Sequence, residues 1–218
     1  MMLPQPVIRP PCGSGQPQPG GSLWLVEPDD DMRPGIEAFI ARVYARRYGA
    51  RVSRFAPCLA GLRDPLSGEW LAAAGFRHAD EAPLFLERYL DAPVEVVLGR
   101  HQGQAVRRQD IVEVGHLAAG QAGAGRLLIP LLGRHLAAGP TRWVVSTLTR
   151  ELRHLFVRMG VTPLALANAA PAAVGAGLAD WGSYYEHGPV VLAGRLDVAL
   201  RLMQRHGAAG PADPQGCS

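Results

Sequence analysis

Apolar residues switch repeatedly between two spacings along this chain, and that alternation limits the folds open to it. Around residues 36–44 they recur every three or four positions, as in an amphipathic helix, whereas around residues 111–118 they alternate as in a strand with two different faces. The pattern predicts strands near 23–27, 51–62, 70–78, 110–118, 142–147, 161–166 and 189–195, and helices near 34–48, 93–101, 126–138, 149–159 and 196–206. We therefore expect an α/β fold with a mixed sheet, antiparallel around the hairpin at 51–78 and covered by helices on both faces.

The two ends of the chain differ in composition from the middle. Residues 1–22 are rich in Pro, Gly and Gln, and residues 207–218 form a second Gly- and Pro-containing tail. Such segments bury too little apolar surface to offset their conformational entropy, so both tails are predicted to be disordered. The part between them has no repeat and no linker, which predicts a single domain over residues 23–206.

Charge and cysteine content exclude several classes of protein. All 22 basic residues are Arg, the formal net charge is +3, and no basic stripe is interleaved with aromatic residues, so we expect no nucleic-acid partner. Cys12, Cys58 and Cys217 are far apart and form no C-x-x-C pair, so neither a disulfide framework nor a metal site is predicted. There is no apolar run of membrane-spanning length and no secretory h-region at the N-terminus, which predicts a cytoplasmic protein without integral membrane association.

A glycine-rich loop separates the strand at 111–118 from the helix that follows it. The loop reads GQAGAG at 120–125 and leads directly into Arg126. Glycines let backbone N–H groups close around an anion, and a helix N-terminus adds its dipole. A pyrophosphate or phosphopantetheine arm would fit there, although a flexible surface loop explains the composition equally well. It is not a dinucleotide-binding fingerprint, because the third glycine is missing.

Three ionisable residues near the centre of the chain are candidates for chemistry. Glu113 lies within an apolar strand, where a carboxylate is either paired with an Arg or has a raised pKa that suits a general base. His116 falls on the opposite face of a regular strand, and a bulge would be needed to bring it to the face of Glu113. Arg77 can orient an anionic group through its planar guanidinium, or it is an ordinary charge at a strand end.

An aromatic cluster occurs near the C-terminal end, in WGSYYEHGP at 181–189. The hydroxyl of Tyr184 or Tyr185 can protonate a leaving group, with Ser183 orienting it, although such clusters are more often core. Ser183 and His187 are further candidates for contacts to a substrate. Because no G-x-S-x-G elbow is present, a hydrolase triad built on Ser183 is not favoured.

Basic residues share one face of the helix at 149–159. Arg150, Arg153 and Arg158 lie opposite its apolar stripe. This face can dock an acidic acyl carrier protein, although a solvated helix face is the usual explanation.

Four segments, taken together, resemble the thermostable hemolysin family. They are AAAGFRHADEAPLFLERYL at 72–90, IVEVGHLA at 111–118, WVVSTLTRELRHLFVRMGV at 143–161 and WGSYYEHGPVVLAG at 181–194. The resemblance covers about residues 23–197, in the same order. That family belongs to the fold group of the GNAT-type N-acyltransferases and is similar to acyl-homoserine-lactone synthases. The resemblance implies a GNAT-like fold, with a mixed, mostly antiparallel central sheet flanked by helices on both faces.

The resemblance also implies an N-acyltransferase. The reaction would move an acyl group from acyl-CoA or an acyl-phosphopantetheine carrier to an amine of a small acceptor, with the thioester as co-substrate and no tightly bound cofactor. Glu113 would deprotonate the amine, Tyr184 or Tyr185 would protonate the thiolate, and Arg77 would bind a carboxylate of the acceptor. The remaining implied contacts are to the substrate, through His116, Ser183 and His187, and to the thioester arm, through Val114, Gly115, Leu117, Gln121, Gly123, Gly125 and Arg126.

Two departures from the related enzymes leave alternatives open. The loop carries Gly120 where acyltransferases of this group have Gln or Arg, which leaves the choice between CoA and carrier protein undecided. His116 stands where lactone synthases carry Arg, so S-adenosylmethionine is a doubtful acceptor. The family name suggests a membrane-damaging protein instead, and a non-catalytic binding module is the third possibility.

Overall fold

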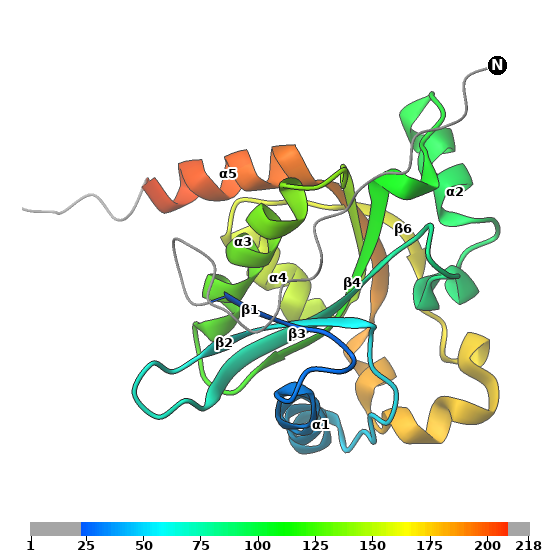
Figure 1. The fold of residues 1–218 in the computed structure, drawn as a ribbon. Helices are drawn as coiled ribbons and strands as arrows, with labels where there is room; N and C mark the ends of the chain where they lie inside the picture. Colours follow the sequence, from blue (N-terminus) through cyan, green and yellow to red (C-terminus); the bar gives the residue numbers. More distant parts are fainter. Residues whose placement is uncertain (1–22, 209–218) are drawn as a thin grey trace, which may run out of the picture.

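The computed structural model describes residues 23–208, which form one seven-stranded sheet between two layers of helices (Figure 1). The strands are β1 (Leu23–Val26), β2 (Cys58–Arg63), β3 (Trp70–His78), β4 (Ile111–Ala119), β5 (Trp143–Leu148), β6 (Leu164–Asn168) and β7 (Val190–Arg195). Their spatial order is β1-β2-β3-β4-β5-β7-β6, and every neighbouring pair is antiparallel except β4 and β5. The predicted mixed, mostly antiparallel sheet is confirmed.

Helices cover both faces of this sheet, as the sequence predicts. They are α1 (Arg33–Tyr48), α2 (Val94–Gln102), α3 (Ala124–Ala137), α4 (Arg150–Arg158) and α5 (Leu196–Ala208), with short 3₁₀ segments η1 (Phe85–Tyr89), η2 (Arg108–Asp110), η3 (Pro171–Trp181) and η4 (Tyr184–His187). Helices α1 and α2 pack on one face, hereafter the α1 face, and α3 and α5 pack side by side on the other, hereafter the α3 face (Figure 1).

The sequence explains where α1 begins and ends. Pro34 occupies its first turn, where the missing N–H has no intrahelical partner to lose. Gly49 ends it in the left-handed conformation, with φ of 65°. Ile36 and Ile40, one turn apart, are fully buried against the α1 face. Burial of a side chain of that size stabilises the fold by about 1.5–3 kcal/mol, which fixes the orientation of the helix.

The α3 face contains the largest cluster of buried apolar residues. Leu128, Leu132 and Leu136 lie on one stripe of α3 and pack against Val112 and Val114 of β4. Because side chains alternate along a strand, the neighbouring Ile111 and Glu113 point to the α1 face. The unlike faces that the sequence predicts for this strand are therefore present.

One predicted strand is wrong over its first part. The strand expected over 51–62 begins only at Cys58, and residues before it form an extended loop. In this loop the carbonyl oxygens of Ala56 and Pro57 accept hydrogen bonds from the guanidinium of Arg33, at 2.7 and 2.6 Å. A side chain of α1 therefore takes the place of a neighbouring strand.

The domain boundaries inferred from the sequence lie close to the limits of the described residues. The tail at 1–22 and most of the tail at 207–218 lie outside them, although α5 continues to Ala208. Between residues 23 and 208, no helix combines the length and the apolar character that crossing a bilayer requires.

Candidate active site

The sheet opens along the boundary between β4 and β5. These two strands are parallel and are paired over three positions only, ending at Glu113 opposite Val145. Strand β4 continues to Ala119 and β5 to Leu148, so their later residues are not paired with each other. Backbone N–H and C=O groups on the facing edges are thus left available to a ligand. We call this opening the β4–β5 gap.

A β-bulge lies in β4 beside the gap. On β3, Ala73 is paired with Ala118 and Gly75 with Gly115, so β4 carries one residue more than β3 over this stretch. The extra residue is His116, whose φ of 51° is the only positive value at a non-glycine position among residues 23–208. Residues on either side of a bulge point to different faces than a regular strand would allow.

The bulge brings His116 to the face of Glu113. The His116 ring packs beside Phe55, with ring centroids 5.6 Å apart, and its Nε2 lies 3.2 Å from the carbonyl oxygen of Arg54. A Cβ on Gly75 would stand 2.9 Å from the His116 Nδ1, so the glycine provides room for the ring. Burial lowers the pKa of His116 to about 4, and the ring is therefore neutral at physiological pH.

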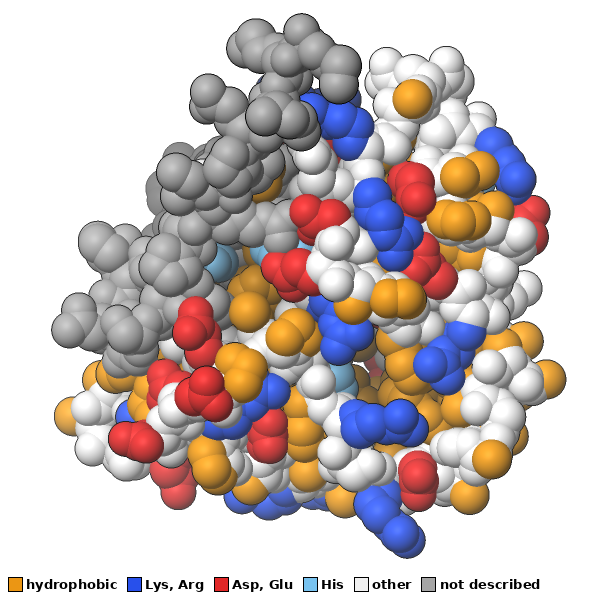
Figure 2. Space-filling view, turned by 45° about the vertical axis from the view of Figure 1, so that its right-hand side comes forward, with side chains coloured by type: hydrophobic (Ala, Val, Ile, Leu, Met, Phe, Trp, Pro, Cys, Tyr) orange, Lys and Arg blue, Asp and Glu red, His pale blue; other side chains and the backbone are white. Residues whose placement is uncertain are grey.

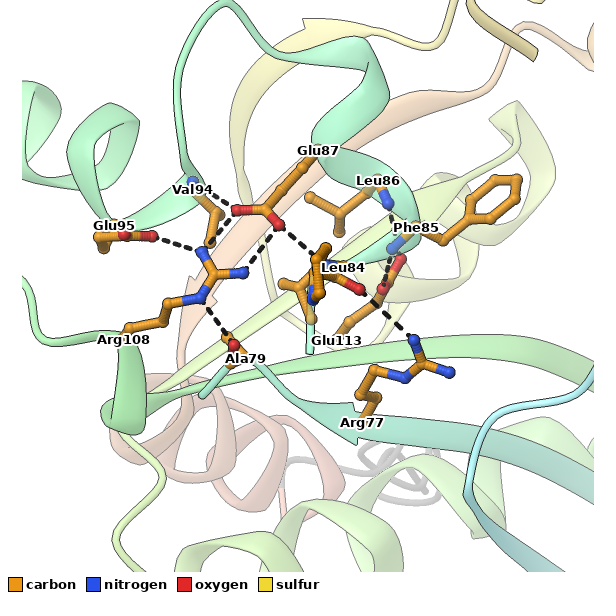
Figure 3. A network of polar contacts seen from close by, with 11 residues as sticks. Arg77, Ala79, Leu84, Phe85, Leu86, Glu87, Val94, Glu95, Arg108 and Glu113 are labelled. Atoms are coloured by element: carbon orange, nitrogen blue, oxygen red, sulfur yellow. Dashed lines mark hydrogen bonds and ion pairs between the residues drawn. The ribbon is translucent and has the colours of Figure 1, made fainter. Parts of the chain in front are cut away.

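Glu113 is held by the backbone of η1. Its carboxylate accepts hydrogen bonds from the N–H groups of Phe85 and Leu86, at 2.8 and 3.1 Å (Figure 3). Burial raises the pKa of Glu113 above its ordinary value, and these two hydrogen bonds together with the charge of Arg77 act in the opposite direction. The carboxylate is thus positioned firmly and is a stronger proton acceptor than an exposed one.

Arg77 lies directly across the β3–β4 ladder from Glu113. Its guanidinium donates one hydrogen bond, to the carbonyl oxygen of Pro83 at 3.4 Å, and forms no ion pair with the carboxylates of residues 23–208 (Figure 3). Most of its N–H donors therefore remain available beside the Glu113 carboxylate.

An ion-pair network fixes η1 from its other side (Figure 3). Arg108 donates to both oxygens of Glu87, at 2.6 and 2.8 Å, to Glu95 at 2.7 Å, and to the carbonyl oxygen of Ala79 at 2.7 Å. Glu87 also accepts the N–H of Leu84 at the start of η1. The turn that presents two N–H groups to Glu113 is consequently anchored at both ends.

Aromatic side chains from η1, η3 and η4 meet on the α1 face of the sheet. Trp181 packs against Phe85 and Tyr185, with centroids 5.6 and 6.0 Å apart, and the hydroxyls of Tyr89 and Tyr185 lie 2.5 Å from each other. Burial raises the pKa of Tyr185, so its phenol keeps its proton at neutral pH. Tyr89 and Trp181 were not among the predicted site residues. The signal for Tyr89 was its position in the APLFLERYL segment that resembles the family.

Tyr184 has a different environment from Tyr185. It is 6% exposed, packs against Tyr44 and Tyr48 of α1, and donates to the carbonyl oxygen of Thr147 at 3.3 Å. Its pKa is also raised by burial. Tyr184 is thus part of the core under the C-terminal end of β5, whereas the half-buried Tyr185 lies nearer the surface.

Ser183 and His187 are not brought together with Glu113. The backbone N–H and the Oγ of Ser183 both donate to the carbonyl oxygen of Tyr48, at 2.8 and 3.2 Å. The His187 ring packs edge-on against the Tyr48 ring, with centroids 5.0 Å apart. Both residues attach η4 to the end of α1.

Gly182 permits this attachment. It has φ of 51° and ψ of −130°, and a Cβ there would overlap the carbonyl oxygen of Tyr48. We expect Gly182→Ala to lower the free energy of unfolding by about 3–5 kcal/mol and to displace η4, because the clash with Tyr48 adds about 1–3 kcal/mol to the roughly 2 kcal/mol cost of a disfavoured backbone conformation. Urea unfolding measures the first effect, and the near-ultraviolet circular dichroism of the aromatic residues, Trp181 among them, measures the second. Gly175→Ala, with φ of 64° and open space around it, is the control; equal losses in both variants would contradict the role assigned to the clash.

The glycine-rich loop joins β4 to α3 at the mouth of the gap. Gly123 caps the N-terminus of α3 with φ of 87°, and Gln121 and Arg126 are exposed on either side. A Cβ on Gly125 would lie 3.7 Å from a methyl carbon of Leu155, so α3 and α4 approach each other there. The four predicted loop residues are therefore close in space, at the end of β4 where the strands have parted.

The predicted basic face of α4 is only partly free. Arg150 and Arg158 are exposed. Arg153 is half-buried and donates to the carbonyl oxygen of Gly188 at 3.2 Å. Glu151 of the same helix forms an ion pair with Arg47 of α1, which reduces the net positive charge of this surface.

On the α3 face the gap leads to an apolar cavity of about 90 Å³. Val114 and Leu117 line it from β4, Ser146 and Leu148 from β5, and α3, α5 and β7 close it below. Ser146 contributes the one polar side chain to the lining, which otherwise consists of apolar side chains and glycine. A space of this composition favours a hydrocarbon ligand.

On the α1 face the gap is open. A Cβ on Gly115, next to Glu113, would meet no atom within 4 Å. Figure 2 shows a hollow on the side that carries η1 and η3, with basic side chains around its mouth and hydrophobic side chains inside. The chain has no Lys, so these basic side chains are arginines. The two sides of the gap therefore differ, with an apolar cavity on the α3 face and charged side chains around the opening on the α1 face.

Comparison with known families identifies the group to which this chain belongs. Residues 26–200 match the family described as thermostable hemolysin. The chain belongs to the thermostable hemolysin family. No curated protein matches it by sequence.

Solved structures show that this member of the thermostable hemolysin family has the fold of acyl-homoserine-lactone synthases. The lactone synthase LasI is 15% identical, with 83% of this chain and 95% of LasI covered and a TM-score of 0.53. FeeM, an N-acyl amino acid synthase from uncultured soil microbes, is 12% identical, with 82% of this chain and 98% of FeeM covered and a TM-score of 0.53. BjaI, a CoA-dependent acyl-homoserine lactone synthase, is 10% identical, with 84% of this chain and 88% of BjaI covered and a TM-score of 0.52. The GNAT-like architecture implied by the sequence is confirmed.

No metal-binding cluster accompanies the site. Among residues 23–208 of this thermostable hemolysin family member, no group of three or more His, Cys, Asp and Glu side chains is arranged to hold a metal ion. The chemical groups gathered at the gap are a carboxylate, a guanidinium, phenols and backbone amides.

Proposed function

We propose that this protein transfers an acyl group from a pantetheine thioester to an amine of a small acceptor. The observation that carries the proposal is the asymmetry of the β4–β5 gap, with an apolar cavity on one face and Glu113, Arg77 and Tyr185 on the other. A thioester lying in the gap has its acyl chain in the cavity on the α3 face and its carbonyl carbon between β4 and β5. The acceptor then lies on the α1 face. The related lactone and acyl amino acid synthases, which share the fold, support the same reaction type.

The reaction forms a C–N bond and breaks a C–S bond. The acceptor nitrogen attacks the thioester carbonyl carbon, and Glu113 takes the proton that the nitrogen loses. Because both oxygens of Glu113 already accept an N–H, a bridging water is the simplest path for that proton. Unpaired N–H groups on the Val114–Leu117 edge of β4 stabilise the oxyanion of the tetrahedral intermediate. Tyr185, with Tyr89 donating to it, protonates the departing thiolate.

Other predicted residues have binding roles in this scheme. Arg77 binds a carboxylate of the acceptor through its free N–H groups. Gln121, Gly123, Gly125 and Arg126 bind the pantetheine arm at the α3 N-terminus, where the dipole favours phosphate. Exposed Arg150 and Arg158, with Arg153, offer a surface to an acyl carrier protein. The reaction belongs in the cytoplasm, where acyl thioesters are made, and its product is a small acylated metabolite.

Thermal stabilisation by thioesters tests the proposal. At a hundred times the dissociation constant, an acyl-CoA or acylated carrier protein should stabilise the native protein by about 2.7 kcal/mol and raise the melting temperature by roughly 5–10 °C. We expect Gly123→Asp to remove this shift, because it places a negative charge where the phosphate binds.

The matched control for this variant is Gly103→Asp. Gly103 ends α2 with φ of 66° and open space around it, so the substitution brings the same charge and a similar backbone strain to a place remote from the loop. A thioester shift that persists in Gly103→Asp and disappears in Gly123→Asp supports the site. No shift with any thioester would overturn the acyltransferase proposal, and leakage assays on liposomes would then test the lytic alternative.

A further inference from the structure

The apolar cavity on the α3 face is small for an acyl pocket. Its volume is about 90 Å³. An apolar protein cavity of about 150 Å³ accepts benzene, which corresponds to about 25 Å³ per carbon atom. On that scale the cavity holds three to four carbon atoms, far fewer than a fatty acyl chain carries.

Helix α5 forms the wall opposite the gap. Ala199 and Leu200 line the cavity from this helix, and Leu132 and Leu136 of α3, which are 3% and 4% exposed, line it from the side. A Cβ on Gly133 would stand 3.0 Å from a methyl carbon of Leu200, so α3 and α5 are already in close contact. Close-packed walls of this kind do not yield to extra methylene groups without cost.

We propose that α5 restricts this protein to short acyl groups, of about five or six carbons including the carbonyl. The count adds the carbonyl carbon, and a carbon within the gap, to the three or four that the cavity holds. This inference rests on the proposed function and extends it by naming the substrate class and two residues, Ala199 and Leu200, that determine specificity.

Binding of a series of acyl-CoA thioesters from acetyl to dodecanoyl tests the inference by calorimetry. Affinity should rise about fourfold per methylene while the cavity fills, which is the transfer free energy of one CH₂ group. It should reach its maximum at about five or six carbons and fall for longer chains, because the close-packed walls leave no apolar space for further carbons.

Two adjacent substitutions on α5 should move this maximum in opposite directions. Leu200→Ala removes three carbon atoms from the wall and should shift the preferred chain about three carbons longer. Ala199→Leu adds three and should leave acetyl or propionyl as the best ligand. Val198→Ala, at an exposed position on the same helix, makes a similar truncation away from the cavity and should change nothing. Circular dichroism verifies that each variant is folded.

The outcomes separate this inference from the proposed function. A wild-type maximum at eight carbons or more, or a maximum unmoved in Leu200→Ala and Ala199→Leu, overturns the chain-length inference while thioester binding itself persists. A wild-type protein that binds no thioester of any length overturns both.

Discussion

Replacing Glu113 with glutamine should lower the turnover number for acyl transfer by about 10²–10⁴-fold, the range typical for loss of a general base. Glutamine has nearly the same shape but cannot accept the proton of the attacking amine. The donor thioester does not contact this carboxylate in the proposed scheme, so its dissociation constant should stay within about twofold. Steady-state kinetics with excess acceptor, together with calorimetric binding of the thioester, measure the two quantities.

The pH dependence of the wild-type rate provides a second measurement. Because burial raises the pKa of Glu113 above its ordinary 4.5, the rate should rise with pH through that higher value as the carboxylate ionises. Between the ordinary and the raised pKa the folded state binds more protons than the unfolded state, so this residue lowers stability as pH increases. Both effects should be absent from Glu113→Gln.

Glu87→Gln is the matched control for Glu113→Gln. It removes the same charge from a carboxylate that also accepts backbone N–H groups around η1, at Leu84 and Val94, but that pairs with Arg108 instead of facing the gap. Glu87→Gln should lose stability and keep most of its turnover. Equal losses of turnover in the two variants would mean that Glu113 only supports η1.

Replacing Arg108 with methionine should lower the free energy of unfolding by about 3 kcal/mol, the low end of the range for breaking a buried ion pair. The side chains of Arg108, Glu87 and Glu95 are 26%, 15% and 25% exposed, so two largely buried carboxylates would lose their common partner. Urea denaturation at pH 7 measures the loss. Arg100→Met, which breaks a pair with Asp91 that is 58% and 76% exposed, is the control and should cost at most about 0.5 kcal/mol.

Acid unfolding distinguishes the network from simple loss of packing. Hydrogen bonds from Arg108 lower the pKa of Glu87 to about 2, from an ordinary value of 4.5. A depressed pKa contributes stability that is present above pH 4.5 and is lost as pH falls towards 2. The wild-type protein should lose stability across this window, and Arg108→Met should lose much less. If Arg108→Met were no less stable than Arg100→Met, the role assigned to the network would be contradicted.

The fold was largely predictable because its signals are local. The strand over 70–78 matches β3 residue for residue, and the strand containing Glu113 is displaced by one position. The strand expected from Arg51 was wrong because Arg33, far away in sequence, binds the carbonyl groups of the loop. Such long-range capping leaves no trace in the hydrophobic pattern.

The site was less predictable, because it depends on tertiary contacts. The sequence showed that His116 would share the face of Glu113 only with a bulge, but a bulge at a non-glycine residue has no reliable signature. The backbone partners of Glu113 and the contact between Tyr89 and Tyr185 join residues from separate segments. The cavity volume depends on how closely α3 and α5 approach, which apolar spacing alone does not determine.

The three-position contact between β4 and β5 also shapes how the chain reaches its native state. On one side of it, β1 to β4 come from residues 23–119, and on the other, β5 to β7 come from residues 143–195. Every antiparallel pairing therefore joins strands within one of two contiguous stretches, whose loops close at modest entropic cost. The parallel pairing is the one ladder that joins the two stretches, and it is the shortest. We therefore expect the pairings within each half of the sheet to form first, and the docking of the halves, which creates the opening between them, to come late in folding.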